Sequence, residues 1–180
     1  MKPAALLSLL TFALAASAQT INPLTAAVTD RFKGIRLNFE ESADLMPDDK
    51  YGFRLTDAQR TFGEWIGHTA ASNYNYCSTI KGEKAPEAAQ HAHHLKAKAE
   101  LSKALKDSFA YCAAALEQMT DQKALAASGP SNPPPVGAMV NLVSSTNEHY
   151  GNIVGYLRFN KLVPPSTARA QKKGAPAPKH

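Results

Sequence analysis

The sequence predicts an all-α protein, an up-and-down-type four-helix bundle. Four segments of about twenty residues each repeat apolar residues at the helical spacing of three and four. The stretches between them are rich in Pro, Gly and polar turn-forming residues, and no segment alternates as a strand would. Amphipathic helices joined by loops bury their apolar faces against one another. The length of 180 residues suits one such domain with a sizeable core.

Residues 1–18 have the organisation of a secretory signal peptide. Lys2 precedes an apolar run over residues 4–15, and three small residues, 16–18, precede Gln19. The apolar run is shorter than a bilayer-spanning helix requires. We expect removal of residues 1–18 and export of the mature chain to the periplasm or the extracellular space. An uncleaved N-terminal anchor is the alternative.

The first predicted helix covers residues 24–45. Its apolar stripe has helical spacing and consists of Leu24, Ala27, Val28, Phe32, Ile35 and Phe39. Gly34 weakens this helix modestly, because glycine is a poor helix former. Residues 46–50 contain Pro47 and two aspartates, which favour a turn, and residues 51–54 form an extended linker.

The second predicted helix begins near Thr61 and continues to about Ile80. Thr61 and Glu64 have the spacing of a capping box, in which each side chain satisfies a backbone N–H of the other residue. Gly82 and Pro86 end this helix. We assign no secondary structure to the polar residues 88–94.

The third predicted helix covers residues 98–119 and the fourth covers residues 136–159. In the third, apolar positions recur at three and four, namely Leu101, Leu105, Phe109, Cys112 and Leu116. Its opposite face is polar and faces solvent. A Gly, Ser, Asn and Pro linker over residues 128–135 separates the two helices.

The predicted bundle domain covers residues 19–163, and residues 164–180 form a basic Pro, Ala and Lys tail that we expect to be disordered. The formal net charge is +5, and Lys2 together with four basic tail residues accounts for all of it. The bundle itself is therefore about neutral, so we expect no nucleic-acid partner. A tail that tethers the protein to an anionic surface is the alternative to a simple solvated extension.

Two histidines lie in the middle of predicted helices, His68 in the second and His149 in the fourth. A buried histidine needs a hydrogen-bond partner or a metal, and bundles build metal sites from facing helices. His68 and His149 are therefore candidate metal ligands, with hydrogen-bonded core histidines as the alternative. The remaining four lie in the polar connection or at the end of the chain, at His91, His93, His94 and His180.

Two segments resemble motifs of the DinB-like superfamily of four-helix metalloproteins. Residues 62–68, FGEWIGH, resemble its second-helix motif, and residues 147–153, NEHYGNI, resemble its fourth-helix motif. The resemblance extends over residues 32–166 and is closer to exported members, in the segments 49–54, 73–78, 109–112, 149–158 and 163–166. The order and spacing of these motifs make the resemblance specific.

The resemblance implies a zinc or nickel ion held by three histidines, one on the second helix and two on the fourth, four residues apart. His68 and His149 match two of these positions, and Ser145 stands at the third. A neutral hydroxyl is a poor ligand beside imidazole. We therefore expect the divalent metal to be weakly bound or absent. Glu148 lies about 100° around the helix from His149 and is interpreted as a surface residue.

The resemblance leaves two functions open. One is a metal-dependent hydrolase or small-thiol transferase that acts on an unknown small molecule through a metal-bound water. The other is a non-catalytic exported binding or interaction bundle that has lost its metal, and Ser145 favours weak or absent catalysis. Homodimerisation through a helix face also remains open. Four polar residues are candidates for lining the cavity or for interhelical hydrogen bonds, Asn73, Tyr76, Asn147 and Tyr150.

The chain has two cysteines, Cys77 and Cys112, which lie in the second and third predicted helices. Disulfides form and persist outside the cytoplasm, so the predicted export favours a disulfide between them. Two small buried thiols are the alternative.

Overall fold

The computed structural model describes residues 21–127, 129 and 133–174. This part of the chain is built from helices and connecting segments, which confirms the all-α class. None of its helices has the length and hydropathy needed to cross a membrane. The predicted signal peptide, Lys179 and His180 lie outside the described residues.

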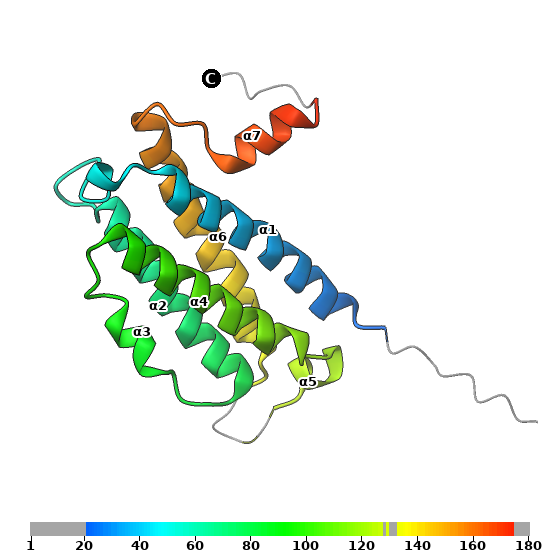
Figure 1. The fold of residues 1–180 in the computed structure, drawn as a ribbon. Helices are drawn as coiled ribbons and strands as arrows, with labels where there is room; N and C mark the ends of the chain where they lie inside the picture. Colours follow the sequence, from blue (N-terminus) through cyan, green and yellow to red (C-terminus); the bar gives the residue numbers. More distant parts are fainter. Residues whose placement is uncertain (1–20, 128, 130–132, 175–180) are drawn as a thin grey trace, which may run out of the picture.

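Four long helices lie side by side (Figure 1): α1 (Pro23–Leu45), α2 (Phe62–Lys81), α4 (Lys98–Glu117) and α6 (Val136–Phe159). Short helices occupy the connections and the C-terminal segment: η1 (Asp48–Lys50), α3 (Glu87–His91), α5 (Asp121–Leu125) and α7 (Pro165–Lys172). Each long helix begins and ends within two residues of the predicted position.

The helices are not connected in the expected up-and-down order. α1 and α2 each pack against both α4 and α6, so α1 and α2 occupy diagonal corners of the bundle. α2 and α4 run in the same direction, because a disulfide joins Cys77 to Cys112 near their C-terminal ends while Gly63 lies close to Leu101 near their N-terminal ends. α6 runs against α2, since Thr69 pairs with His149 and lies one turn before Asn73, which pairs with Thr146.

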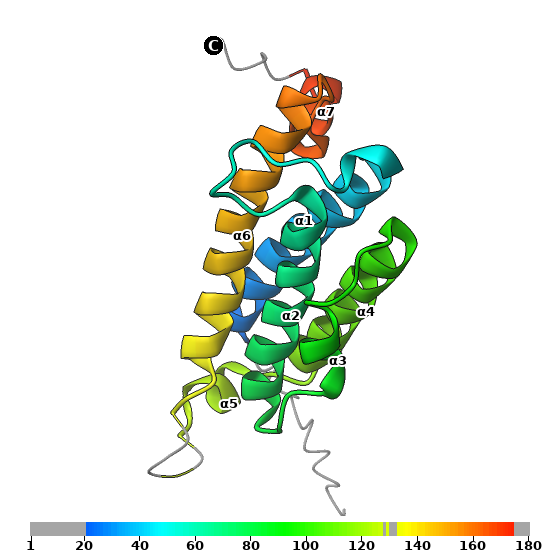
Figure 2. The ribbon, with the colours of Figure 1, turned by 90° about the vertical axis from the view of Figure 1, so that its left-hand side faces the viewer.

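Two parallel helices in succession require the chain to return along the length of the bundle between them. The segment that does so, residues 82–97, contains α3 and packs against α2 (Figures 1 and 2). We call it the return crossover. Its helix α3 occupies part of a region to which the sequence assigned no secondary structure.

Specific polar contacts fix the helix ends. The predicted capping box of α2 is confirmed, because the Glu64 N–H donates to Thr61 Oγ1 at 3.1 Å and the Thr61 N–H donates to Glu64 Oε2 at 2.8 Å. The N-terminus of α1 is capped from a distant part of the chain. The Asp121 carboxylate accepts the backbone N–H groups of Leu24 at 3.0 Å and Thr25 at 2.8 Å.

Aromatic rings hold α1, α4 and α6 together in the core. Phe109 of α4 lies 5.6 Å from Phe32 and 6.0 Å from Phe39, measured between ring centroids. Phe39 also makes an edge contact with Tyr150 of α6, at 5.8 Å. Such pairs stabilise a core beyond the area they bury, so these contacts stabilise the packing of α1 and α4 against each other and of α1 against α6.

The expectation of a disordered tail from residue 164 is wrong for α7. This helix packs against α1, where the Arg169 guanidinium contacts Glu41 and Asn38. The Tyr150 hydroxyl pairs with Ser166 Oγ at 2.9 Å. Part of the basic charge is therefore used in contacts with the bundle, and the ordered unit extends beyond residue 163.

Candidate functional site

The antiparallel packing of α2 and α6 brings together the two histidines selected from the sequence. The imidazole rings of His68 and His149 lie 4.8 Å apart between centroids, with 52° between their planes. His149 is buried, with 8% of its surface exposed, and His68 is partly buried. The two side chains therefore share one site between the helices.

Ser145 lies at this site, one helical turn before His149. Its Oγ is 3.4 Å from His149 Nε2, while Thr69 Oγ1 of α2 is 3.4 Å from His149 Nδ1. Both nitrogens of this imidazole thus have hydroxyl neighbours. Hydroxyl groups can donate or accept, so they hold the ring in place without supplying negative charge.

Trp65 forms a wall of the site beside both imidazoles. Its ring centroid is 5.9 Å from that of His68 and 5.4 Å from that of His149. The guanidinium carbon of Arg60 lies 5.0 Å from the Trp65 ring centroid, a cation–π contact. The indole Nε1 is buried and makes no hydrogen bond within the described part of the chain. Trp65 is also the single tryptophan of the sequence, so its fluorescence reports on this site.

Burial and positive charge favour neutral imidazoles. Burial, followed by the charges of Arg60, His149 and His93, lowers the pKa of His68 to about 4. Burial and then Arg60 also lower the pKa of His149. Both imidazoles are consequently neutral at neutral pH. The positive charge of the nearby Arg60 guanidinium, however, opposes the binding of a metal cation.

A third histidine, His93 of the return crossover, lies next to His68. Their ring centroids are 6.0 Å apart. His93 belongs to the polar connection between the second and third predicted helices, and it is exposed. Gly67 permits the approach, because a Cβ at this position would lie 2.5 Å from the Ala92 carbonyl oxygen. Two glycines four residues apart on one face of α2, Gly63 and Gly67, are the sequence signal for this close packing.

A cavity of about 110 Å³ lies between α2 and the return crossover. Its lining consists of Arg60, Gly63, Glu64, Gly67, His68, Ala92, His93 and Leu95. The Glu64 carboxylate already accepts the Thr61 N–H, and this hydrogen bond is the main cause of its lowered pKa. We call this space the crossover cavity.

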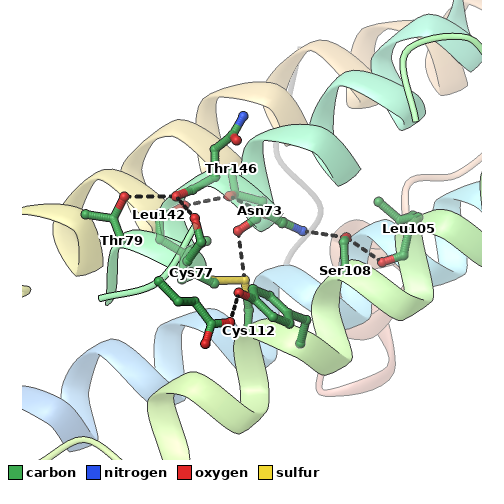
Figure 3. Close-up of a disulfide and its surroundings, with 12 residues drawn as sticks. Asn73, Cys77, Thr79, Leu105, Ser108, Cys112, Leu142 and Thr146 are labelled. Carbon is green, nitrogen blue, oxygen red and sulfur yellow. Dashed lines mark hydrogen bonds between the residues drawn. A yellow bond between two sulfur atoms is a disulfide. The ribbon is translucent and has the colours of Figure 1, made fainter. Parts of the chain in front are cut away.

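The four other polar candidates do not line the crossover cavity. Asn73 is fully buried and bridges α4 and α6: its Nδ2 donates to Ser108 Oγ at 3.1 Å, and its Oδ1 accepts from Thr146 Oγ1 at 3.4 Å (Figure 3). Tyr76 packs against the hydrophobic core. Asn147 accepts a hydrogen bond from Arg31, and the Tyr150 hydroxyl pairs with Ser166.

Three further residues named in the sequence analysis are exposed and do not line the crossover cavity. Glu148 faces solvent on α6, in agreement with its interpretation as a surface residue. His91 and His94 of the return crossover are also exposed. None of the three lines the crossover cavity.

The disulfide between Cys77 and Cys112 joins α2 to α4 one turn from Asn73 (Figure 3). The two Cα atoms are 5.2 Å apart, within the range that this bond requires. The bond holds the two parallel helices in register, and α2 carries His68. The disulfide therefore supports the frame of the site without taking part in it.

The sequence pattern that describes the DinB superfamily matches residues 31–150, which are 120 of the 180 residues. The chain belongs to the DinB superfamily. The matched range includes His68, Ser145 and His149. No curated protein matches the sequence.

The residues present do not fit the three-histidine metal site implied by the DinB resemblance. The position of the third ligand holds the Ser145 hydroxyl, and the neighbouring charge is the Arg60 guanidinium. Among the described residues, no group of three His, Cys, Asp or Glu side chains is arranged to hold a metal ion. A tightly bound catalytic metal normally has three protein ligands and an open position for water.

Proposed function

We propose that this DinB-superfamily chain is an exported, non-catalytic binding bundle that has lost a tight metal site. The observation that carries this proposal is the contact between Ser145 Oγ and His149 Nε2, at 3.4 Å. Ser145 occupies the ligand position at which the superfamily resemblance implies a third histidine. A metal-dependent hydrolase or thiol transferase would need that ligand.

The charges at the site support the same conclusion. Two neutral imidazoles with one hydroxyl hold a divalent ion far more weakly than three imidazoles, because the hydroxyl is a poor donor to zinc or nickel. Arg60 adds a positive charge that disfavours the ion further. We therefore derive no reaction step through a metal.

The same groups suit the binding of a small polar molecule. Neutral imidazoles can both donate and accept hydrogen bonds, and the Trp65 ring provides an apolar wall beside them. Export is part of the proposal, supported by the leader-like residues 1–18. The disulfide suits an oxidising compartment.

Titration of the purified mature protein with Zn²⁺ and Ni²⁺ tests the proposal, with Trp65 fluorescence and calorimetry as readouts. We expect weak binding by the wild type and a gain of more than about tenfold in Ser145→His, equivalent to about 1.4 kcal/mol. Ser144→His is the matched control, because Ser144 is the exposed neighbour and its side chain points elsewhere on the helix.

The zinc and nickel content of the purified protein could contradict the proposed loss of the metal site. Near-stoichiometric zinc or nickel in the wild-type protein, lost in His68→Ala or His149→Ala, would show that the two imidazoles still form a tight site. An unchanged affinity in Ser145→His would show that the three positions do not converge on one ion.

A further inference from the structure

We propose that the crossover cavity binds a small oxyanion, of the carboxylate or phosphate class, through Arg60, His68 and His93. The cavity lies on the side of His68 that faces the return crossover. This inference rests on the proposed function in one respect, since it requires that His68 is not held by a tightly bound metal.

The balance of charge around the crossover cavity favours an anion. Arg60 forms no ion pair within the described part of the chain, and its guanidinium lies against Trp65. Glu64 is the acid in the lining, and two other cations already flank it, Arg54 at 4.0 Å and Lys96 at 3.9 Å. Two cations therefore already compensate the one carboxylate of the lining, so the guanidinium of Arg60 is available to an external anion.

The two imidazoles at the cavity have hydrogen-bonding groups to offer. The side chains of His68 and His93 make no hydrogen bond to each other or to any other described residue, although their rings are only 6.0 Å apart. A neutral imidazole carries one N–H donor. With the guanidinium fork, which matches the oxygens of carboxylates and phosphates, they give three donor side chains around one space.

The size of the cavity restricts the ligand to a small ion. A drug-sized ligand or a nucleotide occupies a pocket of about 300–1,000 Å³, whereas this cavity measures about 110 Å³. Gly63 and Gly67 of α2 are part of its lining and add no side chains to it. The volume of the crossover cavity therefore suits an inorganic oxyanion or a short carboxylate.

The experiment is an anion titration of the purified mature protein at constant ionic strength, read by calorimetry and by Trp65 fluorescence. Phosphate, sulfate, acetate and malonate are compared with chloride. We expect saturable binding of at least one oxyanion, weakened more than about tenfold in Arg60→Gln and several-fold in His93→Gln. The relative affinities for phosphate and the carboxylates distinguish the two sources of the ligand.

Arg158→Gln is the matched control, because it removes the same charge from an exposed position at the end of α6. An unchanged Kd in this variant supports a built site. Equal weakening in Arg158→Gln and Arg60→Gln, or no saturation by any oxyanion, would overturn the proposal. Chemical-shift changes at the His68 and His93 imidazoles should accompany binding even if Arg60→Gln folds poorly.

The two proposals fail separately. Tight zinc binding by the wild type would refute the loss of the metal site, whatever the anion titration shows. Absence of saturable oxyanion binding in a protein that also binds zinc weakly would refute only the anion site.

Discussion

The backbone of Ala92 lies so close to Gly67 that its carbonyl oxygen would be 2.5 Å from a Cβ on that residue. Real Cβ atoms do not approach backbone oxygens this closely, so only glycine fits at position 67 without displacement of the chain. This contact fixes the return crossover to α2. It also places His93 within reach of His68.

Gly67→Ala should therefore destabilise the protein, although alanine is the better helix former. We expect a loss of about 1–3 kcal/mol from overpacking, measured by urea denaturation. Gly34→Ala is the control, because Gly34 lies inside α1 with open space around the position of its Cβ. There the substitution should stabilise by up to about 1 kcal/mol. An equal gain in both variants would show that the crossover does not pack on α2.

Loss of the disulfide should also destabilise the bundle. The bond closes a loop between residues 35 positions apart, and the chain-entropy relation gives about 4 kcal/mol for a loop of this length. The double variant Cys77→Ala, Cys112→Ala should show this loss in urea, and reduction of the wild type should reproduce most of it. Alkylation of two free thiols under non-reducing conditions would contradict the disulfide.

Stability should fall as the pH is lowered from about 6.5 to about 4. An unfolded histidine titrates near pH 6.5, whereas the pKa of folded His68 is about 4 and that of His149 is also lowered. Between these values the unfolded chain binds more protons, so acid favours unfolding. Above pH 6.5 both states have neutral imidazoles, and this contribution to stability is fully present.

His68→Gln should lose less unfolding free energy than the wild type between pH 6.5 and pH 4. We expect a difference of about 1–2 kcal/mol, after allowance for solvent screening of the partly exposed His68 ring. The measurement is the free energy of unfolding in urea at several pH values, compared between variant and wild type. His94→Gln, at an exposed position on the return crossover, should leave the dependence unchanged. Equal slopes in wild type and His68→Gln would mean that the folded His68 titrates normally.

The positions of the long helices could be predicted because local signals specify them. Apolar spacing and turn residues gave the limits of α1 and α6, and the Thr61 and Glu64 pair gave the start of α2. Apolar periodicity shows which face of a helix is buried but does not show which neighbour covers it. The parallel arrangement of α2 and α4 therefore could not be derived from the pattern.

The residues of the site that lie on the buried faces of long helices could be predicted from the sequence. The residues that depend on long-range contacts could not. His68 and His149 each lie in the middle of a predicted helix, so their approach followed from the bundle. The place of His93 depends on how the crossover packs on Gly67. The formation of helix α7 depends on long-range contacts, such as that of Arg169 with Glu41, 128 positions away. The amino-acid composition of the segment does not reveal such contacts.

Asn73 should contribute to stability by joining three helices rather than by binding a ligand. Its side chain is completely buried on α2 and reaches Ser108 of α4 and Thr146 of α6. The Ser108 hydroxyl donates to a carbonyl oxygen of α4, and the single Thr146 proton is shared between Asn73 Oδ1 and a carbonyl oxygen of α6, so removal of Asn73 leaves neither hydroxyl without an acceptor. We therefore expect Asn73→Ala to cost about 1–3 kcal/mol, mostly from lost packing and one or two net hydrogen bonds.

A double-mutant cycle separates these two contributions. Asn73→Ala and Ser108→Ala, alone and combined, should give an interaction energy of about 0.5–1.5 kcal/mol if the hydrogen bond between them contributes to stability. Asn75→Ala is the control, since Asn75 lies two residues away on α2 and is exposed. Oxyanion affinity should not change in Asn73→Ala, because Asn73 does not line the crossover cavity. A loss of ligand affinity without a loss of stability would instead place Asn73 in the binding site.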